Sequence, residues 1–220
     1  KEKIVLVSDA ETPTVDRGTL AHELVHALQD QHFGLGDDPE FQDAQLAENG
    51  GVEGDANYVQ RLYERRCETD WQCLDTPDSS GGSGASSFNM GVFVTIYAPY
   101  AAGPRFVADV HQRNGWDAVD ALYRQYPAST EQVIHPEAYP DEKPVDVTVP
   151  DRSNARWDRF DLDRPAHDRV GEASIYAMLW ANGQVEGEGR SVYEYDHPLS
   201  AGWGGDALVP YRDGDRYGYV

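Results

Sequence analysis

Residues 20–28 read Leu-Ala-His-Glu-Leu-Val-His-Ala-Leu, and this stretch decides how the N-terminal part of the chain folds. Its apolar residues follow the 3.6-residue period of a helix, so we expect one stripe to pack inward, formed by Leu20, Leu24, Ala27 and Leu28. Thr14 or Asp16 can cap the start of this helix. Glycines and Asp37-Asp38-Pro39 end it after about His32.

The same stretch contains the pattern His-Glu-x-x-His, at His22, Glu23 and His26. Residues four apart lie one turn apart on the same face of a helix, so both imidazoles can point at one metal ion. Neutral imidazole suits zinc, and we therefore predict one Zn²⁺ ion at His22 and His26. Glu23 would lie beside the ion, where its carboxylate can take a proton from a metal-bound water and pass it to a leaving amine.

A catalytic zinc ion usually has three protein ligands and a water, so the chain must supply one more ligand. A second predicted helix, from about 43 to 66, offers the carboxylates of Glu48, Glu53 and Asp55. We expect Glu53 to be the ligand, because the small residues around it let this helix approach the first one closely. Glu48 is the alternative.

Two kinds of supporting group are also expected around the metal. A hydrogen-bond acceptor should orient each imidazole, and Asp30 and Asn57 each lie one turn beyond a predicted ligand. An exposed position without such a role is the alternative for both. The oxyanion formed during hydrolysis needs a donor besides the metal, for which His135 and Tyr139 are the best candidates. A capping or packing role for His135 is the alternative.

A His-Glu-x-x-His helix followed by a glutamate on a second helix resembles the gluzincin clan of zinc metallopeptidases. Residues 22–33, His-Glu-Leu-Val-His-Ala-Leu-Gln-Asp-Gln-His-Phe, look more closely like the core of a group of bacterial and archaeal metallopeptidases. Further stretches similar to that group are 53–56, 129–137 and 202–206. The resemblance implies a zincin-like fold, one zinc ion and hydrolysis of peptide bonds. One departure is Asn57, where better-known gluzincins often carry an aspartate that orients the first histidine.

The charge balance narrows the classes of partner. The chain has 39 acidic and 18 basic residues, a net charge of −21, which repels nucleic acid and anionic lipid. No apolar run reaches the roughly 18 residues that a membrane span needs. We therefore expect a peptide or protein substrate and no nucleic-acid partner. The acidic, lysine-poor composition is typical of proteins from high-salt (halophilic) organisms, with an acidic cradle for a cationic substrate as the alternative.

The two cysteines, Cys67 and Cys73, bear on localisation. Their spacing suits a loop-closing disulfide, which persists in oxidising compartments; two free thiols are the alternative. The chain begins at Lys1 without a methionine, so a signal or anchor segment can have been removed. We expect an extracellular or cell-surface protein, with the cytoplasm as the alternative.

The rest of the chain predicts one domain over residues 1–220, of an α+β fold in which helices dominate and the β component is small. Short strands are predicted at 3–7 and 145–149, and β-hairpin structure in the tail from 191 to 220. Further helices are predicted at 88–100, 105–113, 117–126 and 169–181. The serine- and glycine-rich residues 79–87 predict a flexible loop.

Two other functions compete with peptide hydrolysis. One is a metal-bearing binding or cell-surface domain without turnover, whose zinc site would be closed by a fourth protein ligand. The other is a metal-dependent hydrolase that acts on substrates other than peptides. Digestion of a peptide library with and without a chelator distinguishes peptide hydrolysis from these two hypotheses.

Overall fold

The structure is a computed structural model that describes residues 15–36, 39–73, 89–160, 167–187 and 189–220. The predicted strand at 3–7 and the predicted loop at 79–87 lie outside these residues. The fold is α+β and dominated by helices, as the sequence predicts. The α-helices are α1 (Arg17–Phe33), α2 (Gln42–Thr69), α3 (Met90–Asn114), α4 (Trp116–Leu122), α5 (Thr130–Ile134) and α6 (Gly171–Ala181).

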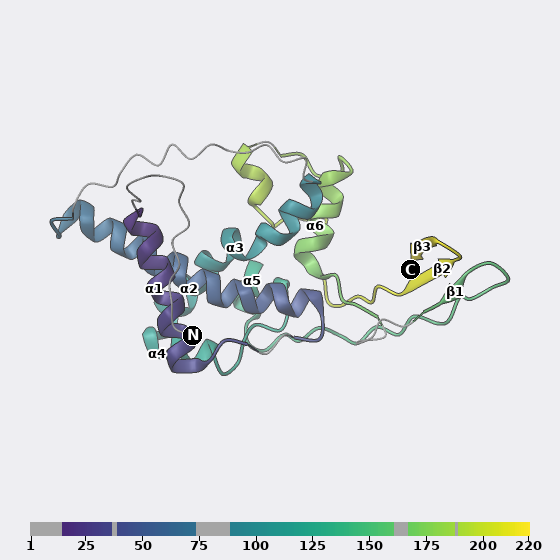
Figure 1. Cartoon of the computed structure of the whole chain (residues 1–220), viewed down its shortest axis with the longest axis horizontal. Helices are drawn as coiled ribbons and strands as arrows, with labels where there is room; N and C mark the ends of the chain where they lie inside the picture. The colour runs from purple at the N-terminus through teal and green to yellow at the C-terminus, as the bar shows by residue number, and fades with distance from the viewer. Residues whose placement is uncertain (1–14, 37–38, 74–88, 161–166, 188) are drawn as a thin grey trace.

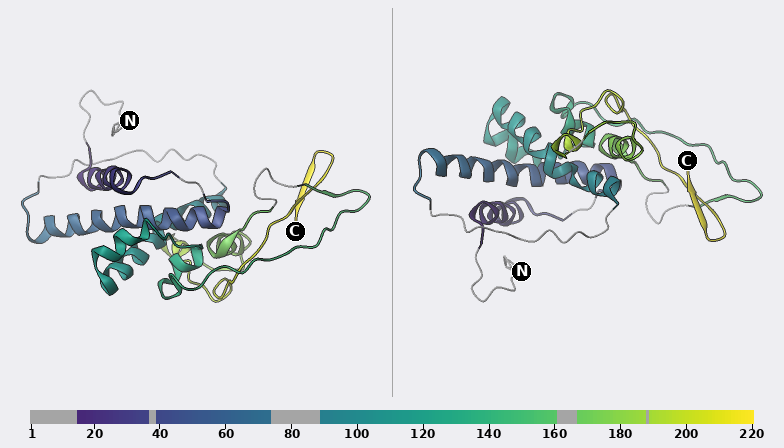
Figure 2. Two further views of the ribbon diagram at one scale, coloured as in Figure 1. Left: turned by 90° about the horizontal axis from the view of Figure 1, so that it is seen from below. Right: turned by 90° about the horizontal axis from the view of Figure 1, so that it is seen from above.

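The β component is a small antiparallel sheet in the order β1-β2-β3. Its strands are β1 (Asp158–Arg159), β2 (Pro210–Asp213) and β3 (Arg216–Tyr219), and two 3₁₀ helices complete the elements, η1 (Pro136–Ala138) and η2 (Gly189–Tyr193). The β2–β3 pair, with Tyr211 opposite Gly218, confirms the hairpin predicted for the tail. The sheet projects from one end of the helical body, and the C-terminus lies there (Figures 1 and 2).

Helix α2 lies in the middle of the helical body, with α1 on one side and α3 and α4 on the other (Figures 1 and 2). Two glycines of α2 allow α3 to cross it closely. A Cβ atom on Gly54 would lie 2.5 Å from the carbonyl oxygen of Gly103, and one on Gly103 would lie 2.4 Å from that of Gly50. The sequence predicted that the small residues beside Glu53 let α2 approach α1 closely, and this reason is wrong for Gly54, which faces α3.

Helix α1 begins where the sequence predicts. The Asp16 carboxylate accepts a hydrogen bond from the Thr19 amide at 2.7 Å and caps the helix. The predicted inward leucine stripe is wrong, because Leu20, Leu24 and Leu28 are 37%, 49% and 54% exposed. The polar face of α1 packs on α2 instead, since its side chains find charged and polar partners there.

Helix α3 corrects the prediction of two helices separated at Pro99 and Pro104. It runs unbroken through both prolines. A proline inside a helix costs about 3 kcal/mol. Both prolines and Phe106 are buried, and this packing offsets the lost backbone hydrogen bonds. The next predicted helix, 117–126, is shorter than expected and ends at Leu122 as α4.

The predicted strand at 145–149 is also wrong. Residues 145–149 form no strand, although the amide of Val145 donates to the carbonyl oxygen of Gly204 at 2.7 Å. Val145 and Val147 are 65% and 38% exposed, so the alternating pattern has no buried face to pack. The predicted helix at 169–181 is confirmed as α6. The amides of Val170, which precedes the helix, and of Gly171, its first residue, donate to the Asp206 carboxylate.

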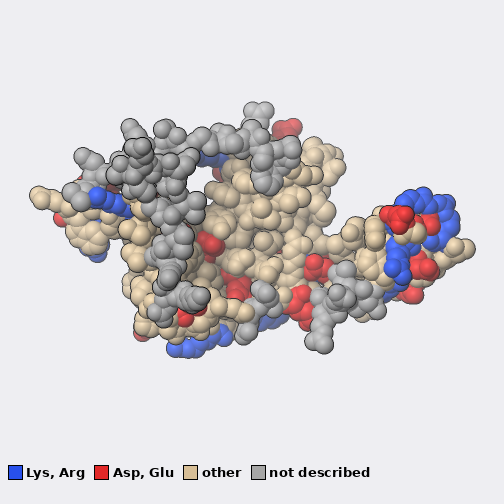
Figure 3. Space-filling model, in the orientation of Figure 1, with Lys and Arg blue, Asp and Glu red and all other residues tan. Residues whose placement is uncertain are grey.

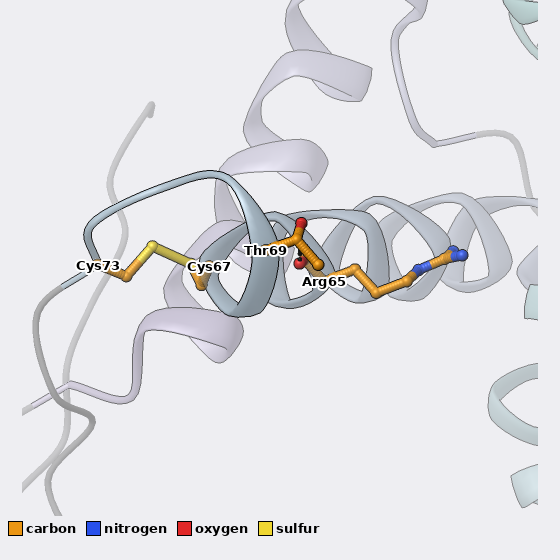
Figure 4. Close-up of a disulfide and its surroundings, with 4 residues drawn as sticks. All are labelled: Arg65, Cys67, Thr69 and Cys73. Atoms are coloured by element: carbon orange, nitrogen blue, oxygen red, sulfur yellow. Dashed lines mark hydrogen bonds between the residues drawn. A yellow bond between two sulfur atoms is a disulfide. The ribbon is translucent and has the colours of Figure 1, made fainter.

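A disulfide follows the end of α2. Cys67, in the last turn of α2, forms a disulfide with Cys73, which confirms the predicted loop closure (Figure 4). In the same turn the Thr69 hydroxyl donates to the carbonyl oxygen of Arg65 (Figure 4). Of the helices in the described residues, none is both long enough and apolar enough to cross a membrane.

Candidate metal centre

Three side chains from α1 and α2 converge at one point. The Nε2 atoms of His22 and His26 lie 3.0 Å apart, and the Oε2 atom of Glu53 lies 3.3 Å and 3.4 Å from them. Ligands in a tetrahedral zinc site, about 2.0–2.1 Å from the ion, lie about 3.3 Å from one another. The three donor atoms therefore have the separations that one zinc ion requires. Within the described ranges, no other group of three such residues converges in this way.

The Oε2 atom of Glu53 is an observation in favour of a cation. It is buried, lacks an aligned hydrogen bond, and faces two imidazoles whose contacts with it are longer than ordinary hydrogen bonds. A buried carboxylate oxygen without a donor is costly, and a bound cation would remove that cost. The donor set, two imidazole nitrogens and one carboxylate oxygen, also suits zinc chemically.

Burial and charge act in opposite directions on the pKa values of Glu53 and His26. Burial raises the pKa of Glu53. The contact with His26, the positive charge of His26 and the hydrogen bond from Tyr100 together outweigh burial and leave the pKa of Glu53 below its usual value. Burial lowers the pKa of His26, but its contacts with Glu53 and Gln29 outweigh burial and leave that pKa raised. Both shifts favour a charged imidazole–carboxylate pair, so protons compete with a metal ion for this group.

Gln29 takes the role that the sequence predicted for Asp30 or Asn57. Its side chain is buried, and its Oε1 atom lies 2.8 Å from the Nδ1 atom of His26. Asp30 instead accepts from the amide of Leu35, and Asn57 donates to the carbonyl oxygen of Glu53. The spacing of three residues from His26 to Gln29, one helical turn, was the available signal.

His22 is held differently from His26. Its Nδ1 atom is buried and has no hydrogen-bond partner among the described residues. The predicted acceptor that would orient each imidazole is thus found for one histidine only.

Tyr100 is a member of the site that the sequence did not indicate. Its hydroxyl donates to the Oε1 atom of Glu53 at 3.0 Å, which leaves Oε2 to face the imidazoles. Burial and the charge of Glu53 raise the pKa of Tyr100 to about 12, so the phenol remains a donor at neutral pH. Tyr100 comes from α3, 47 residues after Glu53, so no local spacing in the sequence joins the two.

Glu23 lies on the exposed side of the same region. Its side chain is exposed on α1, and its negative charge contributes to the raised pKa values of His26 and Tyr100. The predicted base therefore lies within electrostatic reach of the group without being a member of it. Glu48, the alternative ligand, is not in the group either; its charge acts on Tyr126 instead.

His135 and Tyr139, the predicted oxyanion donors, have their hydrogen bonds elsewhere. The Nε2 atom of His135 lies 3.0 Å from the Oε1 atom of Glu172 on α6. The Tyr139 hydroxyl donates to the carbonyl oxygen of Gln125, and its ring packs edge-on against Phe106. Glu172 is fully buried, and burial raises its pKa to about 7 against the opposing effect of His135. His135 therefore serves a buried carboxyl group and not the group on α1 and α2.

A known protein family is similar to the C-terminal part of the chain. A family described as a domain of unknown function (DUF8575) matches residues 158–220, which hold α6 and the three strands. No curated protein and no solved structure matches the chain. The matched segment contains none of the residues of the candidate metal centre.

Proposed function

We propose that this chain is a zinc-dependent metallopeptidase with a gluzincin-like site. The observation that carries the proposal is the convergence of His22, His26 and Glu53 at separations that suit one zinc ion. The order of these residues also supports it, since a His-Glu-x-x-His helix is followed by a helix that supplies the glutamate. A zincin-like fold is part of the same proposal.

Each residue has a defined role in this proposal. His22, His26 and Glu53 would hold the zinc ion, which when bound supplies a Lewis acid and lowers the pKa of water. Glu23, adjacent to His22 and exposed, is the general base that accepts a proton and later returns it to the leaving amine. Tyr100 holds the Oε1 atom of Glu53 and so directs the carboxylate toward the imidazoles.

The charged surface and the disulfide are relevant to the substrate and to the location of the protein. We propose a peptide or protein substrate and an extracellular or cell-surface location. The Cys67–Cys73 disulfide supports an oxidising compartment. Acidic groups are spread over the face shown in Figure 3. The basic groups visible there lie mainly at the left end and lower edge of the helical body and at the projecting sheet, whose strands carry Arg212 and Arg216.

The test of the proposed function is the Glu23→Gln variant. We expect this variant to bind one zinc ion per chain as the wild type does and to lose peptide hydrolysis by about 10²–10⁴-fold, because a carboxamide cannot accept the proton. Zinc content is measured on the purified proteins, and cleavage is measured by mass spectrometry of a peptide library with and without chelator. Glu40→Gln, an exposed change outside the site, is the control. Equal cleavage by wild type and Glu23→Gln would contradict the mechanism. Zinc binding without any cleavage would favour a binding domain.

A further inference from the structure

We propose that Asp55 and Tyr123 act through Gln29 to keep the ring proton of His26 on Nδ1, which leaves the Nε2 lone pair free for the metal. These three are positioning residues, since none of them belongs to the ligand group. The effect on catalysis rests on the proposed function, but the position of the proton on His26 does not.

The amide of Gln29 has one orientation that satisfies its neighbours. Its Nε2 atom donates to the carbonyl oxygen of Val52 at 3.1 Å and to the Oδ2 atom of Asp55 at 3.0 Å. A backbone carbonyl can only accept a hydrogen bond, and so can an ionised carboxylate. The reversed amide would place an oxygen against both acceptors, so the Oε1 atom must be the end that faces His26.

The orientation of Gln29 then fixes the tautomer of His26. The Oε1 atom of an amide only accepts, and it lies 2.8 Å from the Nδ1 atom of His26. The Nδ1 atom must therefore carry the proton. In the neutral ring the Nε2 atom is then unprotonated, and it is the atom that faces His22 and Glu53.

Tyr123 anchors the far end of this chain of hydrogen bonds. Its hydroxyl donates to the same Oδ2 atom of Asp55 at 2.6 Å, and its ring stacks on Phe33 with the ring centroids 4.3 Å apart. Asp55 and Gln29 are both buried, so water does not replace these bonds readily. The hydrogen bonds run from the end of α4 through α2 to α1, across elements that the sequence separates by 68 residues.

His22 provides an internal comparison. Its Nδ1 atom has no partner among the described residues, and its Nε2 atom lies 3.0 Å from that of His26. If His26 carries its proton on Nδ1, its Nε2 atom can only accept, so His22 must donate from Nε2 in the neutral, metal-free protein. The geometry thus assigns opposite tautomers to the two histidines before metal binds.

The experiment measures both tautomers directly. Long-range ¹H–¹⁵N spectra of the metal-free full chain at alkaline pH distinguish Nδ1–H from Nε2–H rings. We expect Nδ1–H for His26 and Nε2–H for His22. A wild-type His26 that carries its proton on Nε2 overturns the proposal, and this measurement needs no variant to fold.

Variants test whether Gln29 and Asp55 cause the preference. Gln29→Leu removes the acceptor, and we expect a mixture of His26 tautomers and a zinc affinity lower by about 10–100-fold. Asp55→Leu should give the same changes to a smaller degree, because Val52 still anchors the amide. Asp55→Asn keeps an acceptor oxygen for Gln29 and Tyr123 and should restore the wild-type tautomer. Asp30→Asn is the control near His26, since the Asp30 carboxylate accepts from the Leu35 amide.

The results separate this proposal from the proposed function. Zinc affinity is measured by competition with a chromophoric chelator and does not depend on turnover. An unchanged His26 tautomer in Gln29→Leu overturns the role of Gln29 even if the enzyme cleaves peptides. The expected tautomers and affinities in a protein without peptidase activity support the role of Gln29 and refute the proposed function alone.

Discussion

At the scale of single residues, the carboxylate of Glu53 divides its two oxygens between two tasks. Oε1 accepts from the Tyr100 hydroxyl, while Oε2 faces the imidazoles of His22 and His26. A metal ligand needs such a partner, because a carboxylate without one rotates freely and loses entropy when it binds. The orientation of Glu53 thus depends on a residue of α3 that lies outside both ligand helices.

Removing the Tyr100 hydroxyl should therefore weaken zinc binding. We expect Tyr100→Phe to lower zinc affinity by about tenfold, with the fold unchanged, since the ring and its packing stay in place. Competition with a chromophoric chelator measures the affinity, and circular dichroism checks the fold. Tyr97→Phe, the same change nearly one turn earlier on α3, serves as the matched control and should bind zinc like the wild type. Equal affinities for Tyr100→Phe and wild type would show that Glu53 orients itself.

At the scale of the elements, the crossing of α2 and α3 places Glu53 and Tyr100 together. Gly54 lies at this crossing, and a Cβ atom there would lie 2.5 Å from a backbone oxygen of α3. Backbone cannot move aside as the end of a flexible side chain can, so the two helices would have to separate. Gly51, one turn away on α2, is also buried, but its Cβ would make ordinary contacts at 3.7 Å or more.

The two glycines form a matched pair of variants. Gly54→Ala should destabilise the protein by about 2–3 kcal/mol because of overpacking, and it should also lower zinc affinity. Gly51→Ala should be neutral or stabilise it by about 0.5–1 kcal/mol, because alanine favours a helix interior over glycine. Urea unfolding of the metal-free proteins measures both free energies. Similar losses for both variants would contradict a close crossing at Gly54 alone.

The parts of the site that the sequence could predict are those placed by the helices α1 and α2 themselves. His22, Glu23 and His26 follow from spacing within one helix, and Glu53 follows from its place on the next helix. The period of Leu20, Leu24 and Leu28 predicted the helix α1 correctly, but it predicted the wrong packing face, because the polar face is the one with partners. Tyr100 and Tyr123 reach the site only through tertiary packing, for which a single sequence carries no local signal.

At the scale of the whole molecule, Asp43 joins helices that are distant in sequence. It lies in the first turn of α2, and its Oδ1 atom accepts from the amide and the hydroxyl of Thr130 at the start of α5. A Cβ atom on Gly171 of α6 would lie only 1.8 Å from the same oxygen, so no side chain fits there. Asp43 is fully buried, and burial raises its pKa to about 6 against the opposing hydrogen bonds from Thr130.

This buried aspartate predicts a pH dependence of stability. The folded pKa, about 6, exceeds the reference value of 3.8, so the folded state binds the proton more tightly. Its contribution to stability is complete below about pH 4 and is lost as the pH rises through about 6, on the order of 3 kcal/mol in total. Asp43→Asn should reduce the slope of the free energy of unfolding between pH 4 and 7 by the share of Asp43, while Glu172, whose pKa burial also raises, keeps its own share. The exposed Asp215→Asn should keep the whole slope, and identical slopes for Asp43→Asn and wild type would refute the assignment.

The exposed leucines of α1 have a consequence for how the candidate centre assembles. Because Leu20, Leu24 and Leu28 remain in contact with solvent, little apolar burial attaches α1 to the rest of the molecule. Its attachment to α2 comes largely from Gln29 and from the two histidines, and a bound cation would join these histidines to Glu53 of α2. Metal binding and the packing of α1 on α2 are then thermodynamically linked. A bound cation stabilises the packed helix by the same free energy by which packing of the helix strengthens metal binding.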